Sequence, residues 1–237
     1  MINVLYEDDH IIVVLKKEGI PTQSGKVTEK DMISELNNHI MKSARAKNAM
    51  ADLKSSGKKD SVYLIHRLDK PVRGILVFAK NSDAAANLNT QMQNDEFSKK
   101  YYALVEGCPA EKEGILENYM YKNSDNIAEI CNIQHTNAKL PKDVKFAKLE
   151  YRVTSTDNIT SVLDIKLYTG RFHQIRCQLS NIGCPIAGDS MYGSALKLKN
   201  RKAIGLVAYS LEFKHPVSKE KMSFTLSQQE VSSCLSL

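Results

Sequence analysis

One short stretch of the chain combines an acidic side chain with several cations, at His66-Arg67-Leu68-Asp69-Lys70. The carboxylate of Asp69 stands between Arg67 and Lys70, and Arg73 follows shortly after. Adjacent positive charges favour the ionised form of a carboxylate, which suits a nucleophile or a base better than a general acid. The residues alone leave a second interpretation open, in which Asp69 is a turn residue within a structural network of ion pairs.

A second charged segment carries Arg171, His173 and Arg176. Apolar residues recur around it at helical spacing, at Ile175, Leu179 and Ile182, and Gly183 suits the position just after a helix end. We therefore expect Arg176 on a rigid helix, where its guanidinium could pair with a carboxylate or clamp a phosphate. Solvated arginines on the protein surface are the plainer alternative for Arg171 and Arg176.

Histidine and tyrosine side chains give three more candidates. His66 and His173 could transfer protons, or each could be a hydrogen-bonded structural residue. Tyr101 could stack on a nucleobase, or it could be a half-buried tyrosine of a strand.

The sequence has no glycine-rich phosphate-binding motif of the Gly-x-Gly-x-x-Gly or Gly-x-x-x-x-Gly-Lys-Ser/Thr type. It also lacks a paired-histidine or carboxylate pattern that would hold a metal ion. We therefore expect a reaction that runs on side chains, with no cofactor and no metal.

The bulk composition is that of a soluble globular protein, with 42% hydrophobic and 25% charged residues. Its 237 residues predict a single domain that spans the whole chain, 1–237. The net charge of +6 is compatible with a polyanionic partner, and equally with simple solubility. Five scattered cysteines indicate free thiols in a reducing compartment. The apolar runs are too short to cross a bilayer, and we expect a cytoplasmic protein without a signal peptide.

The Asp69 stretch should lie between two strands, at residues 62–65 and 75–79, because both are short apolar runs. Catalytic groups are often held on such connections. Helices are expected after an N-cap at Thr28, with Met32, Leu36, Ile40 and Met41 as the apolar stripe, and after an N-cap at Ser82, over residues 83–92. Further strands are expected at residues 4–6, 11–15, 98–107, 115–121, 127–133, 147–154, 161–168, 206–213 and 221–226. This pattern predicts an α+β fold with a mixed, largely antiparallel extended sheet flanked by helices.

Two basic clusters stand apart from these elements. Residues 42–59 carry six cations and one acid, and are either a solvated helix end and loop or a flexible flap that meets phosphates. Lys139, Lys142, Lys145 and Lys148 form the second cluster.

Three blocks of the sequence resemble the RluA-type pseudouridine synthases. His66-Arg67-Leu68-Asp69 with the run from Gly74 to Lys80 is similar to the His-Arg-Leu-Asp signature of that family. The block from Lys99 to Val105 resembles its Lys-x-Tyr-x-Ala block. The block from Thr169 to Arg176 resembles its Thr-Gly-Arg-x-His-Gln-Ile-Arg block, and the similarity continues through Gly188-Asp189 and Tyr192-Gly193.

The resemblance implies isomerisation of uridine to pseudouridine in structured RNA, ribosomal or transfer RNA, without metal or cofactor. Asp69 matches the essential aspartate, and Tyr101 the tyrosine that packs against the target base. Arg176 matches the arginine that pairs with the catalytic carboxylate, and Leu179 an apolar contact beside it. The target uridine should be flipped out of its stack, with Arg67 as a candidate to fill the space. We count His66, Arg67, Arg171, His173 and Leu179 as substrate-binding candidates.

The chain departs from the family pattern at three places: Arg73 replaces a usual Ser or Thr, Phe172 replaces a commoner Thr, and Lys16-Lys17-Glu18-Gly19 stands where Asn-Lys-Pro-x-Gly is frequent. Many family members carry an N-terminal S4 RNA-binding domain. We expect this chain to begin at the catalytic domain, as a monomer without an obligatory protein partner. Two alternatives are a catalytically silent RNA-binding module on the same fold and an unrelated hydrolase that uses Asp69.

Overall fold

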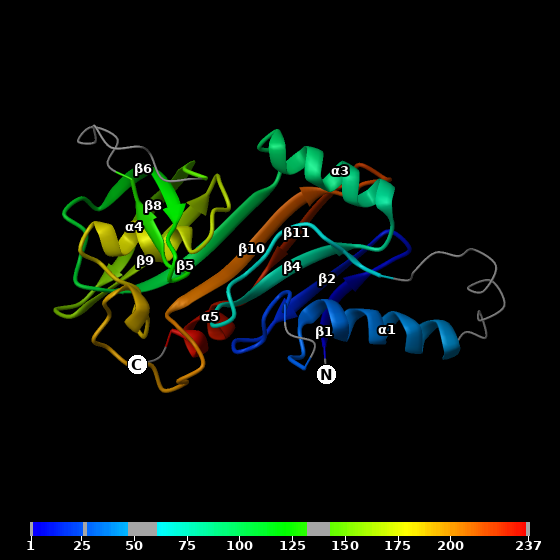
Figure 1. The fold of residues 1–237 in the computed structure, drawn as a ribbon, viewed down its shortest axis with the longest axis horizontal. Helices are drawn as coiled ribbons and strands as arrows, with labels where there is room; N and C mark the ends of the chain where they lie inside the picture. Colours follow the sequence, from blue (N-terminus) through cyan, green and yellow to red (C-terminus); the bar gives the residue numbers. More distant parts are fainter. Residues whose placement is uncertain (1, 26–27, 47–60, 132–142, 236–237) are drawn as a thin grey trace. The chain divides into compact units, whose positions relative to one another are not determined.

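The structure is a computed structural model that describes residues 2–25, 28–46, 61–131 and 143–235. The chain divides into two compact units. The first contains Met1–Phe97 and Glu212–Ser223, and the second contains Ser98–Leu211 and Phe224–Leu237. Strands and helices mix throughout in an α+β fold, as expected, and the sheet is mixed and mostly antiparallel (Figure 1).

The first unit is built on three antiparallel strands in the order β1 (Asn3–Glu7), β2 (Ile11–Lys16) and β4 (Arg73–Ala79). The short strand β3 (Tyr63–Leu64) also pairs with β4. Every residue of β2 is buried, which fits the apolar run from Ile11 to Leu15; the final residue, Lys16, is a buried cation. Two expectations are confirmed here: β3 and β4 are strands, and Asp69 lies on their connection.

Two helices belong to the first unit, α1 (Met32–Ala46) and α3 (Ser82–Gln93). The predicted N-cap at Thr28 is wrong, because the carboxylate of Asp31 accepts the Ser34 N–H at 2.8 Å and α1 begins after it. The predicted cap at Ser82 is also wrong, because Asn81 accepts the Ala84 N–H at 2.9 Å. Met32 and Leu36 are buried as expected, whereas Met41 is exposed.

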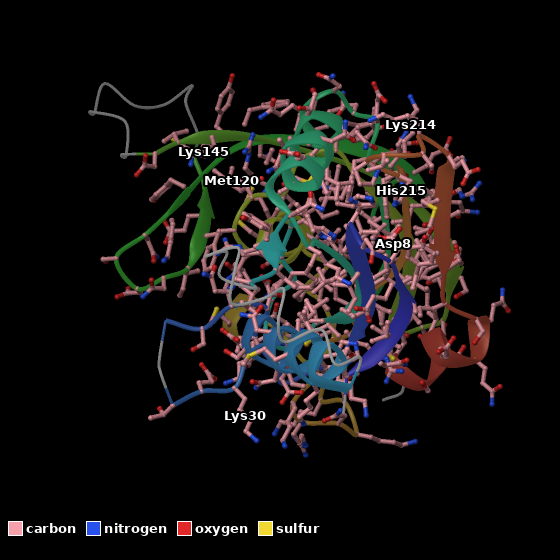
Figure 2. All side chains as sticks on the ribbon, turned by 90° about the vertical axis from the view of Figure 1, so that its right-hand side faces the viewer. Asp8, Lys30, Met120, Lys145, Lys214 and His215 are labelled. Atoms are coloured by element: carbon pink, nitrogen blue, oxygen red, sulfur yellow. The ribbon has the colours of Figure 1, made fainter. Side chains whose placement is uncertain are left out.

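Helix α1 contacts the sheet at one edge, where its His39 bonds to Glu7 of β1 at 2.8 Å (Figure 1). The C-terminal hairpin contributes as well: β10 (Leu206–Lys214) runs from the second unit into the first and pairs with β11 (Lys221–Thr225). Just after β10, His215 lies beside Asp8 (Figure 2), with 2.8 Å between Nε2 and Oδ2. The first two strands and the C-terminal hairpin are therefore joined within this unit by a side-chain bond.

The second unit holds five antiparallel strands in the order β5 (Ser98–Glu106), β9 (Thr160–Leu167), β8 (Lys145–Thr156), β6 (Glu113–Lys122) and β7 (Ala128–Ile130). The expected hairpin turn at residues 123–126 joins β6 to β7. In the β6–β8 ladder Met120 stands opposite Lys145, and Figure 2 labels both residues.

Helix α4 (Gln174–Asn181), the 3-10 turn η2 (Ser190–Tyr192) and helix α5 (Gln228–Cys234) complete the second unit. Helix α4 confirms the expected helix around Arg176, and Gly183 adopts a φ of +77° just beyond its end. Helix α5 was not expected. It begins with a capping box in which Ser227 and Glu230 bond to each other's backbone.

Some of the remaining expectations fall on residues that the structure describes, and others do not. Residues 47–60 and 132–142 lie outside the described residues, and most of the first basic cluster and half of the second lie with them. All five cysteines are free, and three of them are buried. Within the described residues, no helix has both the length and the apolar character needed to span a bilayer.

Candidate active-site residues

Asp69 lies in a tight turn of the first unit. Its carbonyl accepts the Val72 N–H at 3.0 Å, which closes the four-residue turn Asp69–Val72, here called the Asp69 turn. The Asp69 side chain lies at intermediate exposure, between buried Leu68 and exposed Lys70. A carboxylate placed in this way can reach a substrate from a backbone that is held in one conformation.

The backbone on both sides of Asp69 is held by one segment, residues 16–22. The Thr22 hydroxyl donates to the Leu68 carbonyl at 2.8 Å and accepts the Leu68 N–H at 3.1 Å. The Gly19 N–H donates to the Lys70 carbonyl at 2.8 Å, from a φ of +81° that favours glycine. The residues before and after Asp69 are therefore both fixed.

Lys16 is a fully buried cation beneath this turn. Its ammonium donates to three carbonyl oxygens, those of Ile20 at 2.6 Å, Lys17 at 3.1 Å and Lys70 at 3.3 Å. Burial lowers the pKa of Lys16 to about 8, while the carboxylates of Asp69 and Glu18 act in the opposite direction. The sequence marked Lys16 only as part of a departure from the family pattern; its place directly after the apolar run 11–15 is the signal that could have predicted its burial.

The charged neighbours of Asp69 differ in their surroundings. Arg67 is exposed, and Lys70 pairs with Glu29 at 2.6 Å. His66 is buried, with its Nε2 accepting the Val77 N–H at 3.4 Å and its ring edge-to-face on Phe97.

Two of the three departures from the family pattern meet in the first unit. A guanidinium nitrogen of Arg73 lies 4.0 Å from a carboxylate oxygen of Glu18. Glu18, which belongs to the segment that fixes the Asp69 turn, is thus the counter-ion of Arg73.

In the second unit, Arg176 is held by a buried ion pair. Its Nε and Nη2 donate to the two oxygens of Asp189, at 2.7 and 2.9 Å. The guanidinium also lies over the ring of Tyr192, 4.9 Å from its centroid. Leu179 is fully buried on the same helix.

Tyr192 connects this pair to His173. Its hydroxyl accepts the Ala128 N–H at 2.9 Å and lies 3.0 Å from His173 Nδ1. Burial raises the pKa of Tyr192 to about 12, so its hydroxyl is protonated at neutral pH. His173 itself has a φ of +50° at the start of α4 and stacks on Phe172. We call Arg176, Asp189, Tyr192 and His173 the Arg176 cluster.

The other two candidates of the second unit lie on different elements. Tyr101 is buried on β5, opposite Ile165 of β9. Arg171 is exposed, and its Nε donates to the Phe146 carbonyl at 2.7 Å.

The candidates therefore fall into two sets. His66, Arg67 and Asp69 belong to the first unit, and the second unit holds Tyr101, Arg171, His173, Arg176 and Leu179. The structure brings His173 and Arg176 together through Tyr192, whereas the pairing of Arg176 with Asp69 stays a prediction. In the part of the chain that the structure describes, no three His, Cys, Asp or Glu side chains gather as metal ligands.

A family model described as RNA pseudouridylate synthase matches residues 10–181. The chain therefore belongs to the RluA-type family of RNA pseudouridine synthases, and it is an isomerase that acts on RNA. This confirms the resemblance carried by the three sequence blocks.

Three similar curated proteins show the extent of the match. An uncharacterized RNA pseudouridine synthase of Bacillus subtilis, YjbO, is 30% identical, over 94% of this chain and 71% of its own length. An uncharacterized RNA pseudouridine synthase of Aquifex aeolicus is 31% identical, over 97% of this chain and 70% of its own length. The ribosomal large subunit pseudouridine synthase C of Rickettsia typhi is 32% identical, over 81% of this chain and 56% of its own length.

Solved structures share the fold. Human RNA pseudouridylate synthase domain containing 4 superposes with a TM-score of 0.66 at 20% identity, covering 98% of this chain and 91% of that one. Human RNA pseudouridylate synthase domain containing 1 gives a TM-score of 0.67 at 20% identity, covering 99% of this chain and 87% of that one. The expected pseudouridine synthase fold is thereby confirmed.

Proposed function

We propose that Asp69 is the catalytic carboxylate with which this enzyme isomerises specific uridines of structured RNA, ribosomal or transfer RNA. One observation carries the proposal: the backbone on both sides of Asp69 is hydrogen-bonded to residues 16–22, while the Asp69 side chain keeps partial access to solvent. Catalytic groups need such fixed geometry, because misplacement of a reacting atom costs rate.

The reaction needs no oxidant, reductant or co-substrate. The bond between C1′ and N1 breaks, the uracil rotates, and a bond forms between C1′ and C5. The hydrogen on C5 leaves as a proton and N1 gains a proton, so the product is an isomer of the substrate. A carboxylate such as Asp69 can assist by attack on the sugar or by taking a proton.

The other candidate residues receive supporting roles in this proposal. The target uridine leaves the base stack to reach the enzyme, and exposed Arg67 fills the space that it leaves. Tyr101 packs against the target base, with Leu179 as an apolar contact. Arg176 provides the positive charge that pairs with the catalytic carboxylate.

His66, Arg171 and His173 complete the proposed set of substrate-binding residues. Exposed Arg171 suits a phosphate contact, because its guanidinium is reachable from solvent. His66 and His173 are held in place by neighbouring groups, so their rings meet the substrate in a fixed orientation.

We further propose that the enzyme works as a monomer in the cytoplasm, without an obligatory protein partner. The net charge of +6 supports an RNA partner, because phosphate contacts by Lys and Arg supply much of RNA affinity. This part of the proposal rests on composition and family membership.

Tritium release tests the substrate class. RNA labelled with tritium at uracil C5 is prepared from a strain that lacks this gene, and ribosomal and transfer fractions are treated separately. We expect release from one of these fractions, because formation of the bond between C5 and C1′ expels the label. RNA binding without release from any fraction would instead favour a catalytically silent RNA-binding module.

A further inference from the structure

A groove of about 500 Å³ lies on the exposed face of the sheet in the second unit. Three cationic side chains line it, and each comes from a different strand: Lys100 of β5, Arg152 of β8 and Lys166 of β9. All three residues are exposed. The groove therefore collects positive charge that a ligand can reach from solvent.

The groove and the catalytic candidates of this unit lie on opposite faces of the sheet. Successive side chains of a strand point to opposite faces, so exposed Lys100 and buried Tyr101 face apart. Helix α4 lies on the face away from the groove, because its Gln178 donates to the Asn118 side chain of β6 at 2.7 Å. Asn118 is three positions from Ile115, which lines the groove, and so belongs to the other face. The groove is therefore a separate site.

Two of the three cations face each other across neighbouring strands. In the β5–β9 ladder Lys100 stands directly opposite Lys166. Like charges in this position destabilise a sheet. Within the described residues, neither ammonium group forms an ion pair with a carboxylate. A bound anion would relieve the repulsion between the two lysines.

Two acids of the groove are bonded to tyrosines. Glu150 stands opposite Lys166 in the β8–β9 ladder, but its carboxylate accepts the Tyr168 hydroxyl at 2.8 Å. Asp164 stands opposite Arg152 in the same ladder, and it accepts a hydrogen bond from the hydroxyl of another tyrosine, at 3.0 Å. The acids are thus engaged within the protein, while the cations line the groove.

The two ends of the groove differ in charge. Arg152 has acids opposite it on both neighbouring strands, Glu113 on β6 and Asp164 on β9. Lys166 has one acid and one lysine opposite it, Glu150 on β8 and Lys100 on β5. The end at Lys100 and Lys166 is therefore the more positive one.

We propose that Lys100 and Lys166 bind phosphate groups of the substrate RNA, which gives the enzyme an RNA contact on the sheet face opposite Tyr101. The inference rests on the proposed function for its ligand, structured RNA, and not on the role of Asp69. An exposed groove with cations on neighbouring strands suits a nucleic-acid backbone, whose phosphates are contacted by Lys and Arg. The plain alternative is a pair of solvated lysines.

The main test compares two double variants, Lys100→Gln with Lys166→Gln and Lys197→Gln with Lys199→Gln. The second is the matched control, because Lys197 and Lys199 are exposed lysines of the same unit outside the groove. The probe is total RNA from a strain that lacks this gene, bound on filters at several salt concentrations.

We expect loss of Lys100 and Lys166 to weaken RNA binding about tenfold. The slope of log K against log salt should become shallower by about 1.4 to 1.8, which corresponds to two phosphate contacts. The control should stay within about twofold of the wild type. Unchanged binding in the groove variant, or an equal loss in the control, would overturn the proposal.

Stability separates an RNA contact from a structural role. Removal of two like charges that face each other should leave the Tm of the Lys100→Gln, Lys166→Gln variant equal to or above that of the wild type. A loss of affinity that comes with a lower Tm would make the lysines structural and overturn the proposal. Glu113→Gln tests the sign of the effect, because it removes a negative charge from the groove. RNA affinity should rise about twofold, and a fall would contradict a phosphate site.

Two further measurements separate this inference from its neighbours. Calorimetric titration with inorganic phosphate is one; heat of binding that is lost with Lys100 and Lys166 would reassign the groove to free phosphate. Tritium release by the wild type on the same RNA is the other. If the wild type releases no tritium while the groove variant binds RNA more weakly, only the proposed function falls. If the wild type releases tritium and the groove variant binds normally, only the inference falls.

Discussion

The Asp69 turn and the Arg176 cluster hold their key side chains in opposite ways. Thr22, Gly19 and Lys16 bond to the backbone of the residues on either side of Asp69, and Asp69 itself is partly exposed. Around Arg176 the bonds are made to the charged group itself, by Asp189, and both partners are buried.

In the first unit, the groups that hold the Asp69 turn differ from the carboxylate that we propose to react. In the second unit, the charged group that we propose to act is itself part of a stabilising ion pair. A change to the Asp69 carboxylate removes the group that we propose to react, while the backbone bonds of the neighbouring residues to Thr22 and Gly19 remain. A change to Arg176 leaves Asp189 as an uncompensated buried charge, which is costly. The same kind of substitution should therefore have different effects on unfolding in the two places.

The largest effect is expected for Arg176→Met. Removal of one partner of a buried ion pair typically costs about 3–5 kcal/mol, so the free energy of unfolding should fall by that amount and turnover should be lost. Replacing both partners, as Arg176→Met with Asp189→Leu, should recover most of the stability without activity. Denaturant unfolding measures both, and an undiminished stability of Arg176→Met would contradict the comparison.

A smaller effect is expected for Thr22→Val, which has nearly the same shape without the hydroxyl. The N–H and carbonyl of buried Leu68 both lose their partner, at a cost of about 1–3 kcal/mol. We expect kcat to fall as well, because the Asp69 turn is released on one side. Thr22→Ser keeps the hydroxyl and is the control; identical kcat and stability in the two variants would show that these bonds do not matter.

Lys16 should give the folded protein a distinctive dependence on pH. Its pKa is lowered from 10.5 to about 8, so between these values the folded state has lost a proton that the unfolded chain still holds. Stability rises with pH wherever the unfolded state binds more protons. The unfolding free energy of the wild type, relative to Lys16→Met, should thus rise by about 2 kcal/mol from pH 7 to 9.5.

Denaturant melts of both proteins across this range measure the effect. The range stops below pH 10 because the raised pKa values of Tyr192 and Tyr209 act in the opposite direction there. A difference between the two proteins that stays constant with pH would contradict the lowered pKa of Lys16.

The smallest effect is expected for Arg73→Ser, which restores the residue type that the family usually has. The pair with Glu18 is long, at 4.0 Å, so its geometry is poor for a strong ion pair. We therefore expect a smaller change in Tm than for the variants above, and little change in kcat. A large loss of turnover would instead give Arg73 a role in substrate binding.

The elements that carry the site were predictable because each has a strong local pattern. The apolar runs at residues 62–65 and 75–79 located the Asp69 connection, and the spacing of Ile175 and Leu179 located α4. The caps were harder to place. Asp31 and Asn81 can cap as well as Thr28 and Ser82, and local sequence does not decide between neighbouring residues of similar capping strength.

The contacts that hold the site were not predictable in the same way. The bond between Arg176 and Asp189 joins a helix to a loop 13 positions further along the chain, and no periodicity records it. Lys16 is the last residue of a strand whose residues are all buried, and its three carbonyl partners come from turns whose shape only the fold defines. Tertiary geometry, rather than residue type, gives these residues their roles.

The most direct test of the central claim is single-turnover release of tritium from C5-labelled RNA by the wild type and by Asp69→Asn. We predict no release by Asp69→Asn in the time that the wild type needs to finish. RNA affinity should stay within about 1 kcal/mol, because phosphate contacts dominate it. Release by folded Asp69→Asn at a rate near that of the wild type would contradict the assignment of Asp69 as the catalytic carboxylate.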